Sequence, residues 1–148
     1  MGVLEAMKPG LSQLRTAADL LEKLRWEFKN LEAHPADARH AFNFFVTAEH
    51  MADWTNNIPL RKTIPLLRIT SHIASGGKHF ELDPKRHKSV ESVEHDGVYE
   101  PGVYEEGVYD EWLTITLEPN EAKEMKCGGT TDAVSLAKQV LAYWEANA

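Results

Sequence analysis

The sequence is poor in cysteine, in positive charge and in long apolar runs. Cys127 is its only cysteine, so an internal disulfide and a cysteine-based zinc site are both excluded. Its 16 Lys and Arg residues stand against 23 Asp and Glu residues, and the formal charge of -7 disfavours generic binding to a phosphate backbone. No apolar stretch approaches the roughly 20 residues of a membrane span, and the first residues lack the pattern of a secretion signal. We therefore expect a soluble cytoplasmic protein that does not contact a membrane.

The apolar residues that are present recur with the period of an α-helix in four segments. In the first they step by three and four. The second is apolar over more than half of its circumference, in an arc that includes Phe42 and Phe45. Gly76 and Gly77 are expected to end the third helix, and Thr131 to cap the start of the last. With 148 residues and 43% hydrophobic content, one domain over residues 1–148 is expected. The predicted helices cover residues 11–32, 36–54, 64–75 and 131–146.

Between the third and fourth predicted helices, over residues 78–129, the apolar period changes. Leu113, Ile115 and Leu117 alternate with polar neighbours, which predicts short antiparallel strands. The predicted fold class is therefore α+β, a four-helix bundle with a small antiparallel β insertion between helices three and four. The insertion also carries three copies of Gly-Val-Tyr at a period of 5. We interpret them as an exposed turn, and the alternative is a binding loop whose contacts come from Tyr99, Tyr104 and Tyr109.

Two polar groups stand out within the predicted helices. Arg68 and His72 lie four residues apart on the polar side of the third helix. We interpret the pair as part of a solvated helix face. The alternative is a reactive pair, in which the guanidinium holds a phosphate while the imidazole moves a proton near neutral pH. Glu49 falls inside the apolar arc of the second helix, so its carboxylate needs a partner. We expect a structural bridge to a basic group on a neighbouring helix, with a polar pocket as the alternative.

The histidines and one basic cluster suggest ligand binding. The 7 histidines include no HExxH, no HxH and no pair four residues apart, so the usual zinc spacings are lacking. The metal site that remains as an alternative is assembled across helices from His50, His72, His79 and Glu49. We interpret the basic cluster as a solvated loop. The alternative is contact with a small anion or an acidic partner, and its binding residues would be Lys78, His79, Arg86 and His87. No cofactor motif is present, and no cofactor is expected.

Two blocks and the closing helix resemble a group of small, mostly helical bacterial proteins without an established activity. The shared patterns are F-x-F-F-V-T-A-x-H-x-x-D-W, in AFNFFVTAEHMADW, and I-A-x-G-x-K-H-F, in RITSHIASGGKHFEL, with a Trp-bearing last helix in AKQVLAYWEA. The matching positions are Phe42, Phe44, Phe45, Val46, Thr47, Ala48, His50, Asp53, Trp54, Ile73, Ala74, Gly76, Lys78, His79 and Phe80. The resemblance implies a mostly helical fold and names no activity.

A more distant likeness is to HEPN domains, helical bundles that are often ribonucleases. In these domains an arginine precedes a histidine. The spacer between them is somewhat longer than the one between Arg68 and His72. His79 lies farther from Arg68 than that spacing. The likeness implies ribonuclease chemistry by Arg68 with His72 or His79, and the departure in spacing weakens the transfer of these roles.

No recognisable catalytic set accompanies the predicted core. We therefore predict a non-catalytic binding or assembly module of the bacterial cytoplasm, with an origin in mobile DNA as one version of this hypothesis. The alternatives are an HEPN-like ribonuclease and a metal-dependent helical-bundle enzyme. The expected partner is an unknown protein or a small anionic ligand, generic nucleic-acid binding is not expected, and homo-oligomer formation is left open.

Overall fold

The computed structural model describes residues 10–78, 89–97 and 111–148. Within these ranges the chain is mostly helical and carries a small three-stranded antiparallel sheet, which confirms the predicted α+β class. In chain order the elements are α1 (Ala17–Ala33), α2 (Ala38–Trp54), α3 (Leu60–Thr63), α4 (Pro65–Lys78), β1 (Val90–Gly97), β2 (Glu111–Leu117), α5 (Pro119–Glu124), β3 (Thr130–Asp132) and α6 (Ala133–Asn147). The short helices α3 and α5 and the strand β3 were not predicted from the sequence.

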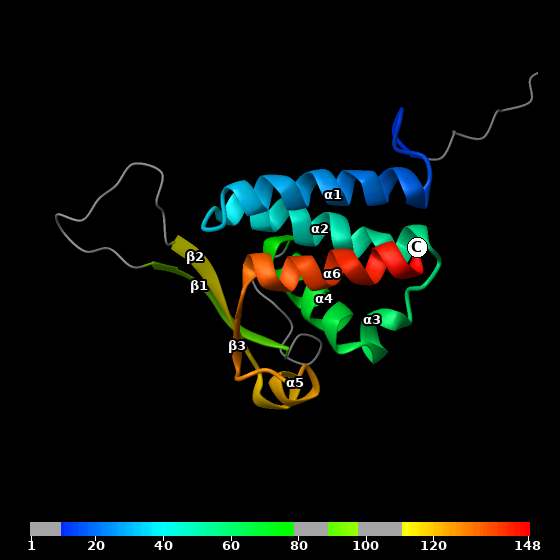
Figure 1. Ribbon diagram of the computed structural model, residues 1–148. Coiled ribbons are helices and arrows are strands. Elements are labelled where there is room, and N and C mark those ends of the chain that lie inside the picture. Colours follow the sequence, from blue (N-terminus) through cyan, green and yellow to red (C-terminus); the bar gives the residue numbers. More distant parts are fainter. Residues whose placement is uncertain (1–9, 79–88, 98–110) are drawn as a thin grey trace, which may run out of the picture.

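The longer helices pack on one another and on the sheet. Helix α2 contacts α1, α4 and α6, while α6 also contacts α1, and the sheet contacts α4 and α6 (Figure 1). Phe44 and Trp144 are fully buried between the helices, and Ile115 of β2 is 1% exposed in the same cluster. One apolar core therefore extends from the helices into the sheet. Burial of these large side chains stabilises the fold because it removes apolar surface from water.

Side-chain caps set where α1 and α2 begin. The predicted start of the first helix at residue 11 is wrong, because Thr16 and Asp19 form a capping box that starts α1 at Ala17. The Thr16 hydroxyl accepts a hydrogen bond from the Asp19 amide at 3.1 Å, and the Asp19 carboxylate accepts one from the Thr16 amide at 3.0 Å. Asp37 caps α2 without a capping box, since its carboxylate accepts a hydrogen bond from the Arg39 amide at 2.9 Å.

The predicted end of the third helix at Gly76 and Gly77 is also wrong. Helix α4 passes through both glycines and includes Lys78. Glycine permits a left-handed helix end but does not force one, and it remains in a helix at a cost of about 1 kcal/mol relative to alanine. At the other border, Thr131 belongs to β3, and α6 is capped by Asp132, whose carboxylate accepts from the Ser135 amide at 2.9 Å. The last helix therefore begins later than predicted.

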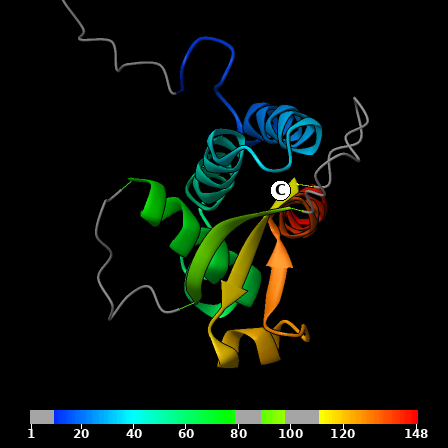
Figure 2. The same cartoon turned by 90° about the vertical axis from the view of Figure 1, so that its left-hand side faces the viewer.

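The sheet has the strand order β1-β2-β3, and β2 confirms the predicted alternation. Its residues Leu113, Ile115 and Leu117 are buried, and its intervening residues are partly exposed. Figure 2 shows the three strands side by side. Val93 pairs with Ile115 and His95 with Leu113, so Val93 and His95 lie on the core-facing side of the sheet.

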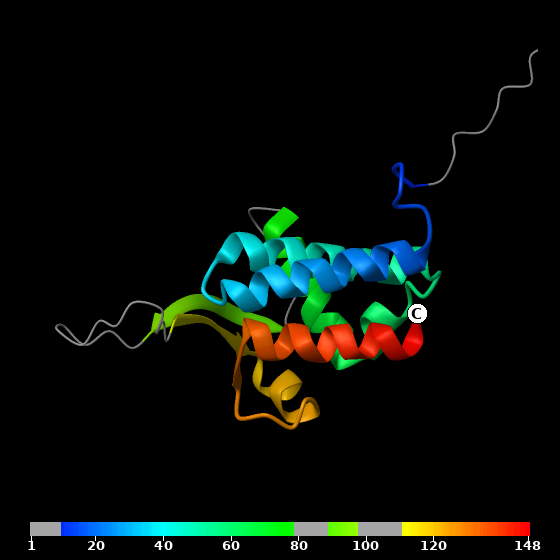
Figure 3. The ribbon, with the colours of Figure 1, turned by 45° about the horizontal axis from the view of Figure 1, so that its top comes forward.

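The paired strands β1 and β2 extend beyond the ends of the helices (Figures 1 and 3). Val93 is 45% exposed and His95 is also exposed, although both lie on the side of the sheet that faces the core. The helices therefore leave part of this sheet face uncovered near the α1–α2 turn. Among the helices of the described ranges, none is long and apolar enough to cross a membrane.

Candidate functional site

Arg68 is engaged by carboxylates of α5. Its Nη2 lies 2.9 Å from Glu121 Oε1 and its Nε 3.2 Å from Glu121 Oε2, and it also pairs with Glu124. Its Nη1 donates to the Lys62 carbonyl at 3.0 Å. The hydrogen bonds with Glu121 raise the pKa of the Arg68 guanidinium above its ordinary value. The guanidinium that would hold a phosphate under the alternative interpretation therefore already holds two carboxylates of its own chain.

Glu121 connects three parts of the fold. Its side chain is buried, and besides Arg68 it accepts a hydrogen bond from the Ser89 hydroxyl at 3.0 Å. Glu118 fixes the position of Glu121 by capping the start of α5. Its carboxylate accepts hydrogen bonds from the amides of Asn120 and Glu121. A buried carboxylate needs such partners to offset its lost hydration. The cluster of Arg68, Glu121 and Ser89 thus joins α4, α5 and the start of β1.

His72 does not lie on a solvated face of α4, which corrects the prediction from the helical wheel. It is 7% exposed, and its Nδ1 accepts a hydrogen bond from the Val90 amide at 3.1 Å. An accepting nitrogen carries no proton, so this contact requires Nδ1 to be unprotonated. Arg68 is directed to α5 and His72 to β1. Their hydrogen bonds therefore support the packing of α4 rather than a shared open site.

Glu49 forms the bridge that its position in the apolar arc predicts. Its Oε1 lies 2.7 Å from Arg61 Nε of α3 and accepts from the Ser71 hydroxyl of α4 at 3.1 Å. Arg61 also pairs with Asp53. Burial raises the pKa of the Glu49 carboxyl, although Arg61 and Ser71 act in the opposite direction. Glu49 therefore joins three helices, and its partners belong to the fold.

The described residues do not assemble the metal site. His50 is exposed on α2, and His72 and Glu49 have the partners given above. Within residues 10–78, 89–97 and 111–148, no three His, Cys, Asp or Glu side chains are placed to hold a metal ion. The Lys78 side chain is outside the described part of the structure. Several predicted binding residues also lie outside the described residues and remain predictions, namely His79, Arg86, His87, Tyr99, Tyr104 and Tyr109.

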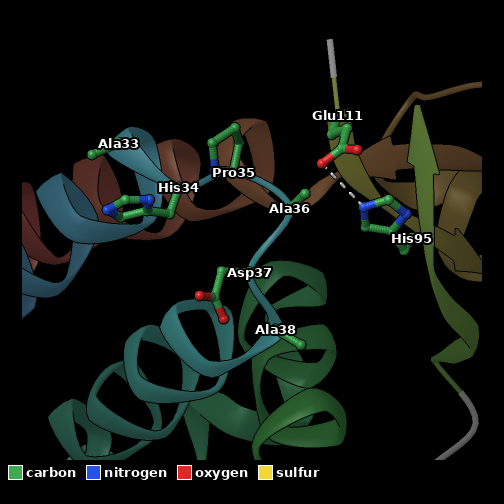
Figure 4. Close-up of a pocket in the computed structure, with 8 residues that line it drawn as sticks. All are labelled: Ala33, His34, Pro35, Ala36, Asp37, Ala38, His95 and Glu111. Carbon is green, nitrogen blue, oxygen red and sulfur yellow. Dashed lines mark ion pairs between the residues drawn. The ribbon is translucent and has the colours of Figure 1, made fainter. Parts of the chain in front are cut away.

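A pocket opens where strands β1 and β2 extend past the helices. It has a volume of about 530 Å³ and lies between the α1–α2 turn and the ends of β1 and β2 (Figure 4). We call it the turn pocket, and it is lined by Ala33, His34, Pro35, Ala36, Asp37, Ala38, His95 and Glu111. Its volume falls within the range of roughly 300–1,000 Å³ that is typical of small-molecule sites.

The two carboxylates of the turn pocket, those of Asp37 and Glu111, differ in the partners that neighbouring side chains provide. Asp37 forms an ion pair with Arg39 through two hydrogen bonds. Arg39 Nε lies 3.0 Å from Asp37 Oδ1, and Arg39 Nη2 lies 2.9 Å from Asp37 Oδ2. These hydrogen bonds from Arg39 lower the pKa of the Asp37 carboxyl far below its ordinary value. On the opposite wall, Glu111 Oε2 lies 3.5 Å from His95 Nε2, and both side chains are substantially exposed (Figure 4).

The sequence predictions did not identify this pocket. Pro35 indicated a break between the first two helices, and His34 and Glu111 carry polar groups, but nothing in the sequence brings residues 33–38 near residues 95 and 111. The useful signal was indirect. Strand alternation places His95 on the same face as Val93, but only the structure shows that this part of the face is uncovered.

Comparison of the chain with models of protein families, with curated proteins and with solved structures found no match.

Proposed function

We propose that the chain is a non-catalytic binding module of the bacterial cytoplasm, and that its ligand or partner enters the turn pocket. The observation that carries this proposal is the pocket itself. Four of its lining residues, Ala33, Pro35, Ala36 and Ala38, are small or apolar, and polar groups stand on both of its walls. An apolar surface with a few oriented polar groups is the usual composition of a binding site. The resemblance to small bacterial proteins supports the cellular location.

The scaffold suits binding at this place. We include in the proposal that α1, α2, α4 and α6 act as a four-helix bundle, with α1 and α2 presenting their connecting turn at one end. The ion pairs of Arg68 with Glu121 and of Arg61 with Glu49 hold α5 and α3 against this scaffold. The turn that lines the pocket is short and is held at both ends by packed helices, and the other wall is a strand pair, so both walls rest on regular elements.

The geometry favours neither enzymatic alternative. A ribonuclease of the HEPN type needs its arginine free to meet a phosphate, whereas Arg68 holds Glu121 and Glu124. A metal enzyme needs converging ligands, and the described candidates His50 and His72 have different surroundings, one exposed and one buried against β1. Binding without catalysis requires none of these groups to be free.

Filling the turn pocket should abolish binding without unfolding the protein. We expect Ala36→Phe to prevent a mixed set of cationic, neutral and anionic fragments from shifting the amide NMR signals of His34 and His95. Ala36 is half-buried and lines the pocket, so a phenyl ring there takes up its volume. The matched control is Ala142→Phe, which makes the same change on the exposed face of α6 and should leave fragment binding unchanged. If no fragment of any charge shifts these signals in the wild-type protein, the proposed function is wrong.

A further inference from the structure

The charges around the turn pocket indicate what kind of ligand it takes, and this inference rests on the proposed function. Asp37 contributes little free charge, because both of its carboxylate oxygens accept hydrogen bonds from Arg39. The same carboxylate caps the amino end of α2, which is the helix end that would otherwise attract an anion. This wall of the pocket is therefore already occupied by an acid-base pair and offers no free site to an anion.

The other helix end at the turn has the opposite preference. The carboxyl end of α1 meets the pocket at Ala33 and His34, and the last turn of α1 contains no basic side chain. The carboxyl end of a helix carries a partial negative charge, which a cation stabilises. Lysine, arginine and histidine are the residues that commonly stabilise this end of a helix. Here the C-cap is His34, whose ring stacks on that of His40 at a centroid distance of 5.1 Å, and the last turn has no lysine or arginine.

Glu111 supplies the full negative charge of the pocket. Its neighbour His95 balances that charge only when the imidazole is protonated. Unlike Asp37, Glu111 has no arginine or lysine within ion-pair distance among the described residues. Opposite it, the side chains of Ala33, Pro35 and Ala36 provide apolar surface (Figure 4). The pocket thus combines a carboxylate and a helix carboxyl end with an apolar wall.

We infer that the turn pocket binds an organic cation, an ammonium or guanidinium group on a short apolar stem. The cation pairs with Glu111 near the carboxyl end of α1, and the stem packs on Ala33, Pro35 and Ala36. A lysine side chain of a protein partner and a free alkylamine share this chemistry, because each buries its methylene groups and keeps its charge at a polar rim. The small anion expected from the basic cluster would meet a repulsive charge here.

The test is an NMR titration at about pH 8, where histidine side chains are ordinarily neutral. The probes are Nα-acetyl-lysine-N-methylamide, its uncharged norleucine analogue, butylamine and acetate, each up to roughly 10 mM, since single-group ligands bind in the millimolar range. We expect both amines to shift the amide signals of His34, Ala36 and His95, and the norleucine analogue and acetate to have at least tenfold weaker effects. Tighter binding of the lysine amide identifies a protein side chain as the source, and tighter binding of butylamine identifies a free amine.

Substitution of the charged group separates a specific contact from general attraction. Glu111→Gln should weaken binding of both amines by about tenfold, as expected for loss of one charge-assisted hydrogen bond. Glu94→Gln removes the same charge from the opposite face of the sheet, where Glu94 pairs with Thr114, and should change binding by less than about twofold. Equal weakening by the two variants would overturn the inference. Stronger binding of acetate or of the norleucine analogue at the same amides would also overturn the inference, but it would leave the proposed function standing. Failure of every probe to shift these amides would overturn both the inference and the proposed function.

Discussion

Replacing Phe45 with alanine is expected to lower the free energy of unfolding by roughly 3 to 5 kcal/mol. Phe45 is 1% exposed and lies on α2, the helix that contacts α1, α4 and α6. Its ring meets that of Phe44 edge to face at a centroid distance of 5.2 Å. Removal of the ring loses apolar burial and this contact, and it leaves a cavity that the surrounding helices fill only in part. Denaturant titration measures the change.

Phe42→Ala is the matched control for this prediction. It makes the same substitution on the same helix, but Phe42 is 45% exposed. We expect its effect to stay below about 1 kcal/mol, as is usual for exposed positions. If Phe45→Ala also lowers the free energy of unfolding by less than about 1 kcal/mol, then α2 is not the central element of the core.

Arg68→Ala is expected to lower the free energy of unfolding by about 2 to 4 kcal/mol. The substitution leaves the buried Glu121 carboxylate with the Ser89 hydroxyl but without a cation. Loss of one partner of a buried ion pair costs about 3 to 5 kcal/mol, and the 28% exposure of the Arg68 side chain reduces this figure through solvent screening. The measurement is again a denaturant titration, with circular dichroism to show that the helices persist.

A second substitution shows whether the unpaired charge causes this loss. Glu121→Gln in the Arg68→Ala background removes the uncompensated charge and can keep the hydrogen bond with Ser89. We expect the double variant to be more stable than Arg68→Ala alone, and its change in stability to differ from the sum of the two single changes by about 1 kcal/mol or more. Additive effects of the two substitutions would mean that Arg68 and Glu121 do not depend on each other. As a comparison, Arg39→Ala removes an arginine from an exposed pair and should leave stability nearly unchanged.

The fold could be predicted from the sequence where local pattern decides the structure. The apolar period predicted α2 and its buried residue Phe45, and strand alternation predicted β2. The same pattern placed Phe42 in the apolar arc, although it is exposed, because a wheel does not tell which part of an arc meets another helix. Gly76 showed the same limit, since a residue that permits a helix end was interpreted as one that causes it.

The candidate site depended on contacts between distant segments, and these could not be predicted. His72 looked exposed on its helix, but its partner is the backbone amide of Val90, a residue in the later strand β1. Arg68 looked free to bind a ligand, but Glu121 lies 53 residues further along the chain. Glu49 was more informative, because a carboxylate on an apolar face must have a partner wherever that partner lies in the sequence. Physical necessity thus predicted the bridge, while its partner Arg61 emerged only from the fold.

The central claim of the proposal is that Arg68 and His72 support the fold and do not catalyse a reaction. Its most direct test is the rate of RNA cleavage by the purified wild-type protein in the presence of a metal chelator. We expect the RNA to remain intact to the level of a protein-free blank, because Arg68 is held by Glu121 and Glu124. Cleavage by the wild-type protein that falls by roughly 10²-fold in a folded Arg68→Lys variant, as loss of a catalytic group would produce, would contradict the account.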